Sequence, residues 1–333
     1  DARKVHKTPV PRLGGLAFLP VILISLCIIT GIRYYMNEPV ALVWSSCLFM
    51  RYLFLVAGTT LLYLVGVADD LVGVSYRYKF VVQILSASFL PLSGLWINDL
   101  GGLLGLHAIP AFIGMPLTVF LVVYITNAIN LIDGIDGLAS GLTCIALGLL
   151  IIVCTLVGQW THALLASATL GVVITFFYYN VFSVSGRKLF MGDAGSLTLG
   201  YILSFLILHF WMQQEYWEPF KLNLNMVTIS TLFIPLLDVV RVFYSRVRSG
   251  RNPFLPDKNH IHHKLLRTGM RIRTVMITLL MLSLFLVVAN FVLSFYINAT
   301  FMLLFDLIFW CTSHLVINRA IVKHEKLTGR KWY

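Results

Sequence analysis

Apolar runs of about 20 residues recur along the whole chain, and they constrain the fold more than any other feature. A helix needs about 20 apolar residues to cross the roughly 30 Å hydrocarbon core of a bilayer. We expect ten such spans, with bounds good to a few residues: 14–36, 52–68, 80–98, 109–126, 138–158, 162–180, 190–212, 226–245, 274–297 and 299–320. The sequence therefore predicts an all-α polytopic membrane protein.

The composition supports this class and a single domain. Hydrophobic residues make up 59% of the 333-residue chain and charged residues only 12%, which is more apolar surface than a water-soluble domain needs. No repeat, low-complexity tract or long linker marks a second domain, so we expect one integral-membrane domain over residues 1–333. The five cysteines lie in apolar runs without disulfide or metal-ligand spacing, and we interpret them as small hydrophobic residues.

Basic residues are distributed unevenly between the two sides that alternate along the predicted spans. One side holds 22 of the 25 Lys and Arg residues, in segments 1–13, 69–79, 127–137, 181–189, 241–273 and 319–333. By the positive-inside rule this side is cytoplasmic. The formal net charge of +11 therefore describes a cytoplasmic face suited to anionic head groups or anionic substrates, and nothing in the sequence indicates nucleic acid.

The connection near 98–110 lies on the opposite side. Short apolar stretches there are separated by Gly101, Gly102 and Pro110, a pattern typical of a small hairpin. We expect this hairpin to be extracytoplasmic, and we assign it no chemistry.

A polar segment at 127–138 directly follows an apolar run. Two amides and two carboxylates recur in it at every third residue: Asn127, Asn130, Asp133 and Asp136. Gly134 and Gly137 predict that the helix breaks here and that the backbone approaches another group closely. Carboxylates at the edge of a membrane span are costly unless they face water, a cation or a ligand, so we expect a functional site. The alternative is a polar helix end rich in turn residues.

Two further acidic motifs lie on the same predicted side. Adjacent carboxylates Asp69 and Asp70 end the second span, and Lys79 begins the next. This arrangement suits a lipid phosphate, although a snorkelling lysine beside solvated acids is the alternative. Asp193 lies among Gly, Ala and Ser at a predicted helix start. The hard oxygen atoms of its carboxylate suit Mg²⁺. The alternative is that Asp193 only caps the helix.

Basic residues mark both the N-terminal segment and the longest cytoplasmic loop. Lys7 belongs to a basic run beside prolines and a Gly pair, which fits either a phosphate-binding loop or an anchor to anionic lipid. In the loop, His260, His262 and His263 are flanked by Arg and Lys. Cations with imidazoles suit phosphate oxygens better than a zinc site. We expect the neighbouring positive charges to lower the pKa of His262.

Four motifs, in this order, resemble those of the polyprenyl-phosphate N-acetylhexosamine-1-phosphate transferases. They are Asp69-Asp70, Asn-Ala-Ile-Asn-Leu-Ile-Asp-Gly-Ile-Asp-Gly at 127–137, Met-Gly-Asp-Ala-Gly-Ser at 191–196 and His-Ile-His-His at 260–263. The resemblance runs from about Lys7 to His263. Such multi-pass enzymes of the bacterial inner membrane transfer a sugar-1-phosphate from a UDP-sugar to undecaprenyl phosphate and release UMP. They usually have one more span ahead of the Lys7 region.

The resemblance and the motifs together assign expected roles. Asp69, Asp70 and His262 are expected to be catalytic, and Asp193 to bind Mg²⁺, with Mn²⁺ as an alternative. The expected substrate-binding residues are Lys7, Lys79, Asn127, Asn130, Asp133, Asp136, Arg248, Arg251, His260 and His263. Direct attack by the lipid phosphate and a phospho-aspartate intermediate both stay open, as does a homodimer.

The interrupted histidine motif is similar to the branch that uses UDP-N-acetylglucosamine or a related N-acetylhexosamine donor. That branch begins O-antigen, enterobacterial common antigen or teichoic-acid linkage units. The peptidoglycan enzyme, phospho-N-acetylmuramoyl-pentapeptide transferase, generally has an unbroken His triplet and is the alternative. An ion-coupled transporter is a remote alternative, because its acidic residues belong near the bilayer midplane and often in repeated halves, whereas here they lie at one face.

Overall fold

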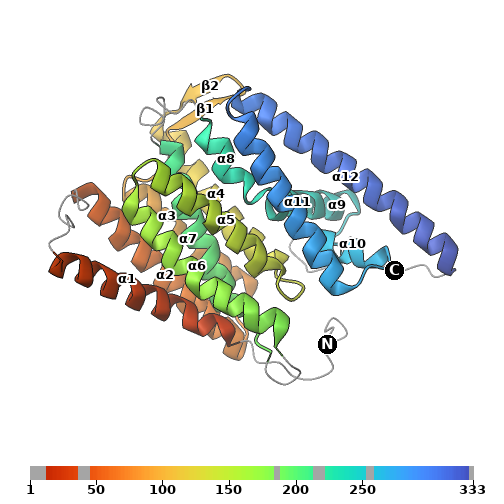
Figure 1. Ribbon diagram of the computed structural model, residues 1–333, viewed down its shortest axis with the longest axis horizontal. Coiled ribbons are helices and arrows are strands. Elements are labelled where there is room, and N and C mark those ends of the chain that lie inside the picture. Colours follow the sequence, from red (N-terminus) through yellow and green to blue (C-terminus); the bar gives the residue numbers. More distant parts are fainter. Residues whose placement is uncertain (1–12, 37–45, 184–187, 213–221, 253–258, 330–333) are drawn as a thin grey trace.

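The computed structural model describes residues 13–36, 46–183, 188–212, 222–252 and 259–329. Within these ranges the chain forms a bundle of helices and one two-stranded hairpin (Figure 1). The helices are η1 (Gly14–Ala17), α1 (Phe18–Tyr35), α2 (Ser46–Val72), α3 (Tyr76–Leu92), α4 (Ala111–Ile132), α5 (Leu138–Leu156), α6 (Trp160–Phe182), α7 (Gly192–Met212), α8 (Leu224–Ser230), α9 (Phe233–Arg248), α10 (Ile261–Arg267), α11 (Ile272–Leu293) and α12 (Ala299–Thr328). Lys7 lies outside the described residues, so its role stays a prediction.

The expected membrane spans correspond to helices. Among the described residues, 8 helices are long and apolar enough to cross a membrane, and the pair α8–α9, bent by 70°, brings the number to 9. The expected span 80–98 is the exception. It corresponds to α3, which has 17 residues and ends at Leu92, and the hairpin follows it. The count of ten spans therefore stays a prediction, while the all-helical membrane class is confirmed.

Helix α7 forms the centre of the bundle. Every residue from Ala194 to Trp211 is buried, which fits its sequence, because apolar residues occur on all of its faces. Helices α2 and α4 pack against it most extensively, and α5 and α6 lie beside it (Figure 1). The position of α7 therefore sets the positions of its neighbours.

Glycines bring the neighbouring backbones close to α7. A Cβ atom on Gly66 of α2 would lie 2.5 Å from the Cα of Ala194, and one on Gly200 would lie 2.6 Å from the Cα of Thr126 in α4. Such distances leave no room for a side chain, and the atoms in the way are backbone atoms that cannot rotate aside. Small residues thus fix how α2 and α4 align with α7.

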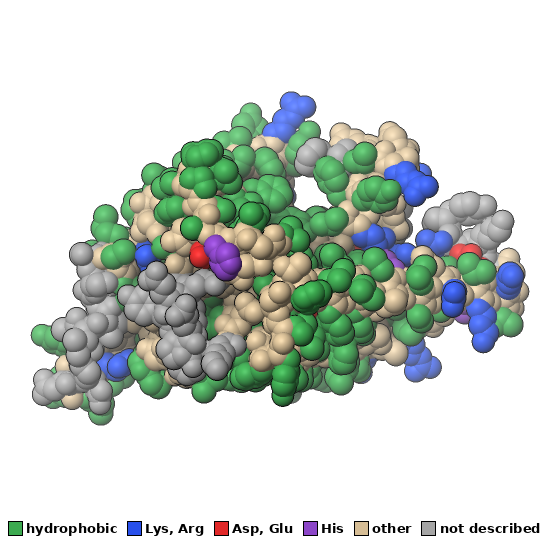
Figure 2. Space-filling view, turned by 90° about the horizontal axis from the view of Figure 1, so that it is seen from above, with side chains coloured by type: hydrophobic (Ala, Val, Ile, Leu, Met, Phe, Trp, Pro, Cys, Tyr) green, Lys and Arg blue, Asp and Glu red, His purple; other side chains and the backbone are tan. Residues whose placement is uncertain are grey.

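The outer surface is largely apolar. Ile28 of α1, Phe112 and Phe120 of α4 and Val288 of α11 are examples of large hydrophobic side chains that are exposed. Figure 2 shows hydrophobic side chains over much of one face, with several Lys and Arg side chains toward the end where the C-terminal part of α12 lies. An apolar surface of this extent is stable in contact with lipid acyl chains and not with water.

The hairpin predicted near 98–110 is confirmed. Strands β1 (Asp99–Leu103) and β2 (Leu106–Ala108) pair antiparallel, with Asp99 opposite Ala108. The N–H of Leu104 at the turn donates to the Oγ1 of Thr300 at 2.7 Å, which ties the hairpin to α12. Its position outside the membrane stays a prediction.

Replacement of Gly200 by Ala tests the close packing of α4 on α7. The new methyl group meets the Thr126 backbone, so the helices must separate, and we expect the free energy of unfolding to fall by about 1–3 kcal/mol. Gly148→Ala in α5 is the matched control, because nothing lies within 4 Å of its added methyl group. Thermal unfolding of both purified variants measures the effect, and equal midpoints would contradict the prediction.

Candidate active site

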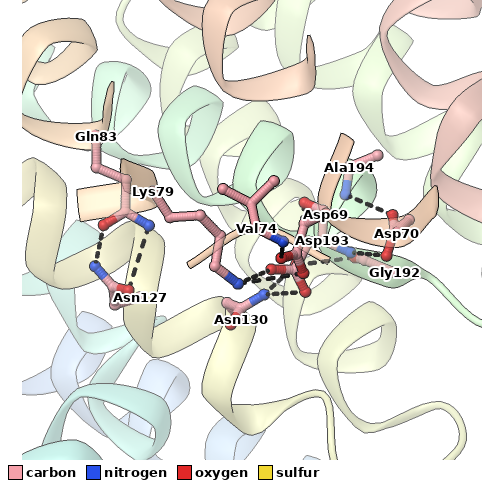
Figure 3. Close-up of polar contacts among 11 residues, drawn as sticks. Asp69, Asp70, Val74, Lys79, Gln83, Asn127, Asn130, Gly192, Asp193 and Ala194 are labelled. Carbon is pink, nitrogen blue, oxygen red and sulfur yellow. Dashed lines mark hydrogen bonds and ion pairs between the residues drawn. The ribbon is translucent and has the colours of Figure 1, made fainter. Parts of the chain in front are cut away.

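The acidic motifs meet at one end of the bundle. Because successive helices run in opposite directions, this end combines the C-terminal ends of α2 and α4 with the N-terminal ends of α3 and α7. Figure 3 shows the side chains that these four helix ends contribute. Residues more than 120 positions apart in the sequence therefore come into direct contact, as the distance of 2.9 Å between the Asp70 Oδ1 and the Asp193 nitrogen shows.

Asp70 caps helix α7. Its Oδ1 accepts a hydrogen bond from the Asp193 N–H at 2.9 Å, and its Oδ2 accepts one from the Ala194 N–H at 3.0 Å (Figure 3). The first N–H groups of a helix have no partner within the helix and carry partial positive charge, so a carboxylate satisfies and stabilises them. Asp70 thus has a structural role that the sequence did not predict, and its catalytic role stays a prediction.

Lys79 joins two carboxylates. Its Nζ lies 2.8 Å from the Oδ2 of Asp193 and 3.2 Å from the Oδ2 of Asp69. Asp69 also accepts a hydrogen bond from the Val74 N–H at 2.7 Å, which fixes the turn between α2 and α3. The predicted proximity of Lys79 to the Asp69-Asp70 motif is confirmed. The structure adds Asp193 to this contact, and we refer to Asp69, Lys79 and Asp193 as the acidic network.

The two asparagines of α4 have different partners. Asn130 donates from Nδ2 to the Oδ1 of Asp193 at 3.1 Å and to the Oγ of Ser196 at 2.8 Å, so it belongs to the acidic network. Asn127 instead pairs with Gln83 of α3, to which its Nδ2 donates at 2.7 Å (Figure 3). Sequence reasoning missed Ser196 and Gln83, because only the fold brings them to these amides.

The segment after α4 forms the turn that Gly134 and Gly137 predicted. Gly137 has a φ of +79° at the start of α5, where its N–H donates to the Oδ1 of Asn180. Asp136 forms an ion pair with Lys188, whose Nζ lies 2.7 Å from its Oδ2. The expected interruption of the helix is therefore confirmed, and Asp136 faces a cation that sequence reasoning had not assigned to the site.

Asp133 is the acid of this turn that stays exposed to solvent. Although the residue reaches solvent, protein atoms lie close around its carboxyl group. This burial raises its pKa to about 7, with a further contribution from the carboxylates of Asp136, Asp193 and Asp70. A positive charge bound near Asp133 would return this pKa toward its ordinary value, so the site is electrostatically suited to a cation.

Asp238 of α9 organises the histidine loop. Its Oδ2 lies 2.9 Å from the Nδ1 of His260, and its Oδ1 accepts hydrogen bonds from the N–H of Ile261 at 3.0 Å and from Arg241 at 2.7 Å. Arg241 also donates to the backbone carbonyl of Asn259. Sequence reasoning assigned no role to Asp238 or Arg241. His260 is therefore held by Asp238 of α9, and its role in substrate binding stays a prediction.

His262 connects the loop to the acidic end of the bundle. A Cβ atom on Gly134 would collide with the Nε2 of His262, so the ring packs directly against the 133–137 turn. The residue is only 1% exposed, and neither ring nitrogen has a hydrogen-bond partner among the residues that the structure describes. Burial, followed by the charges of His263 and His260, lowers its pKa to about 3. The predicted direction is confirmed, but burial is the leading cause.

The other predicted site residues of this region are His263, Arg248 and Arg251. His263 is half-buried, and its ring centroid is 4.2 Å from that of His262. Arg248 and Arg251 are exposed, and no contact joins them to the acidic network within the part of the chain that the structure describes. Their expected contribution to substrate binding thus stays a prediction.

The donor set around Asp193 suits Mg²⁺. Among the described residues, no three His, Cys, Asp or Glu side chains form a complete metal-binding group. Mg²⁺ does not require one, because it usually takes one or two protein carboxylates and completes its shell with water and substrate phosphates. Asp193 and Asp69 already face a shared positive charge at Lys79, and Asp133 is exposed nearby. These residues fit a divalent cation that arrives with a phosphate ligand.

The fold and the site together define a multi-pass membrane protein with a mixed acidic and basic site at one end of its helices. Residues 52–210 match the family described as glycosyl transferase family 4. The chain is 31% identical over 283 residues to the undecaprenyl-phosphate alpha-N-acetylglucosaminyl 1-phosphate transferase of Yersinia pestis, which covers 83% of this chain and 72% of the relative.

Two further relatives agree with this match. The enzyme of the same name from Escherichia coli K12 is 31% identical over 284 residues, or 83% of this chain and 71% of the relative. A probable undecaprenyl-phosphate N-acetylglucosaminyl 1-phosphate transferase of Bacillus subtilis is 31% identical over 278 residues, or 80% of this chain and 69% of the relative. The chain belongs to this family of polyprenyl-phosphate N-acetylhexosamine-1-phosphate transferases, as its four motifs predicted.

The low pKa of His262 predicts a specific dependence of stability on pH. Its folded pKa of about 3 lies below the ordinary value of 6.5, so between these values the unfolded chain binds a proton that the folded chain does not. The free energy of unfolding should therefore decrease as the pH falls below 6.5, by up to about 1.4 kcal/mol per pH unit from this residue.

The variant His262→Gln removes this contribution. We expect its unfolding midpoint to fall less than that of the wild type when the pH is lowered from neutral to mildly acidic values. His107→Gln, an exposed histidine of the hairpin, is the control and should behave as the wild type does. Parallel pH profiles of wild type and His262→Gln would mean that His262 is not held in its neutral form.

Proposed function

We propose that this protein transfers N-acetylglucosamine-1-phosphate from UDP-N-acetylglucosamine to undecaprenyl phosphate and releases UMP. The names of its relatives support the acceptor and the sugar phosphate. The observation that carries the proposal is the contact of Lys79 with both Asp69 and Asp193 at the helix ends, because it combines a phosphate-binding cation with metal-binding carboxylates. The reaction would begin the synthesis of a surface polysaccharide such as O-antigen, common antigen or a teichoic-acid linkage unit.

We assign the site to the cytoplasmic side of the bacterial inner membrane. The predicted segments on this side hold 22 of the 25 Lys and Arg residues, and the UDP-sugar is a cytoplasmic metabolite in this proposal. Undecaprenyl phosphate would approach from the inner leaflet and place its phosphate beside Lys79. The hydrophobic outer surface of the bundle suits the lipid chain of this acceptor.

In this mechanism an oxygen of the lipid phosphate attacks the β-phosphorus of the UDP-sugar. The bond from that phosphorus to the bridging oxygen breaks, and UMP leaves with the electron pair. Lys79 would hold the lipid phosphate by charge, and Asn130 would keep the Asp193 carboxylate in place through its hydrogen bond at 3.1 Å. His262, buried and neutral, would donate a hydrogen bond to a phosphate or ribose oxygen.

Asp193, with Asp69 or Asp133, would hold Mg²⁺, with Mn²⁺ as an alternative. When bound, this cation supplies charge that neutralises the pyrophosphate. Both oxygens of Asp70 accept hydrogen bonds from α7, at 2.9 and 3.0 Å, so nucleophilic attack by Asp70 would remove the cap of that helix. This geometry supports direct attack by the lipid phosphate over an intermediate on Asp70.

Purified protein with undecaprenyl phosphate, Mg²⁺ and a panel of UDP-sugars tests the proposed reaction. We expect UMP release from UDP-N-acetylglucosamine and none from UDP-N-acetylmuramoyl-pentapeptide, because the histidine motif is interrupted. Turnover of the pentapeptide donor alone would contradict the branch, and UMP release from no donor would contradict the proposed function. Omission of undecaprenyl phosphate is the control for simple hydrolysis.

Replacement of Asp193 by Asn tests its role in the reaction. The variant keeps the size of the side chain but removes a negative charge from the site, and we expect the rate to fall by about 100-fold or more. Asp99→Asn in the hairpin is the matched control and should keep the wild-type rate. UMP release and the unfolding midpoint are measured for both. An active Asp193→Asn enzyme at ordinary Mg²⁺ would show that the metal is held elsewhere.

A further inference from the structure

A second group of buried polar side chains lies at the other end of the bundle. His162 is in the first turn of α6, His209 is in the last turn of α7, and Arg51 is in the N-terminal part of α2. The two imidazole rings stack with their centroids 3.8 Å apart and their planes at 21°. The exposed fractions are 1% for His162, 3% for His209 and 8% for Arg51. None of these residues belongs to the site proposed above.

These three side chains have more hydrogen-bond donors than acceptors. Within the described ranges, neither ring nitrogen of His162 or His209 has a hydrogen-bond partner, and the Nε of Arg51 has none either. Each neutral imidazole supplies one N–H and one acceptor nitrogen, and the guanidinium supplies donors and no acceptor, so the excess of donors comes from Arg51. The charge of Arg51 acts on both histidines, whereas no carboxylate of the described residues does. A buried cation without a counter-charge is strongly unfavourable, so the group requires an acceptor from another source.

The surroundings limit the size of that acceptor. The rings of Tyr52 and Phe205 pack against His162 with centroid distances of 5.7 Å each, and they form apolar walls beside the donors. With all three polar residues more than nine-tenths buried, a lipid phosphate with its acyl chains would require the helices to open. A small monovalent ion requires the least room of any such acceptor and can still accept hydrogen bonds from several directions.

We propose that Arg51, His162 and His209 form a binding site for a small inorganic anion of the halide class. The anion supplies the counter-charge of Arg51 and accepts hydrogen bonds from the imidazoles. It links α2, α6 and α7 at the end of the bundle opposite the acidic network. The site does not depend on the transferase reaction, and its role is to stabilise the packing of α7 at that end.

The unfolding midpoint of the full-length purified protein, measured in sodium chloride and in sodium gluconate of equal ionic strength, tests this site. We expect chloride to raise the midpoint by about 3 °C at ten times its dissociation constant, because it binds the folded state alone. The effect should be lost in His209→Phe, which keeps a stacked ring without N–H groups, and in Arg51→Met. Arg33→Met, in the last turn of α1, is the matched control and should keep it.

A second measurement does not depend on the stability of any variant. Crystals of the wild type grown in bromide should show an anomalous scattering peak beside the His162–His209 pair. Equal midpoints in chloride and gluconate, or a chloride effect that persists in His209→Phe, would overturn the proposal. Stabilisation by inorganic phosphate and not by chloride would overturn the assigned class of anion.

A carboxylate of the chain itself is the remaining occupant to test. Glu38, Glu215 and Glu218 lie outside the described residues. If one of them occupied the site, chloride would not stabilise the wild type but would stabilise the corresponding Glu→Gln variant. That result would overturn the proposal, whereas stabilisation of the wild type by chloride would support it.

Discussion

The cap that Asp70 places on α7 is the interaction on which much of the structure depends. Helix α7 is only partly exposed at its first two residues and is buried from Ala194 to Trp211, so a side chain from another element is well placed to satisfy its first N–H groups. Asp70 satisfies two of them and thereby fixes the end of α2 against the start of α7. The same contact places Asp193, in the first turn of α7, within 2.8 Å of Lys79. The packing of the core and the geometry of the site thus share one cause.

Asp238 has a comparable role in the histidine loop. It accepts hydrogen bonds from a backbone N–H, a guanidinium and an imidazole, so that its buried charge is compensated and His260 and Ile261 are held against α9. His260 is engaged in this way, whereas the buried ring of His262 beside Gly134 has no hydrogen-bond partner among the described residues. A buried donor without a protein partner costs stability unless something else binds it, and this cost is the physical reason for the proposed contact of His262 with substrate.

Much of this was predictable from the sequence. Hydropathy predicted the helices, Gly and Pro predicted the hairpin, and the alternation of spans predicted that Asp69, Asp133 and Asp193 would lie at the same end. Contacts between distant side chains were not predictable. Gln83 looks like an ordinary polar residue of a helix until the fold places it beside Asn127. The burial of His262 was equally inaccessible, because neighbouring charges can be read from the sequence but the packing of a loop against a turn cannot.

The two ends of α7 differ in what their polar groups need. The N-terminal end has partial positive charge and is compensated by carboxylates of this chain. The C-terminal end has partial negative charge, which favours a cation such as Arg51 at long range. Among the described residues no acceptor pairs with the Nε of Arg51, however, so the helix dipole offsets part of its charge and leaves this N–H unsatisfied. A dipole acts on charge alone, whereas the proposed anion would also accept hydrogen bonds from Arg51 and the two stacked imidazoles.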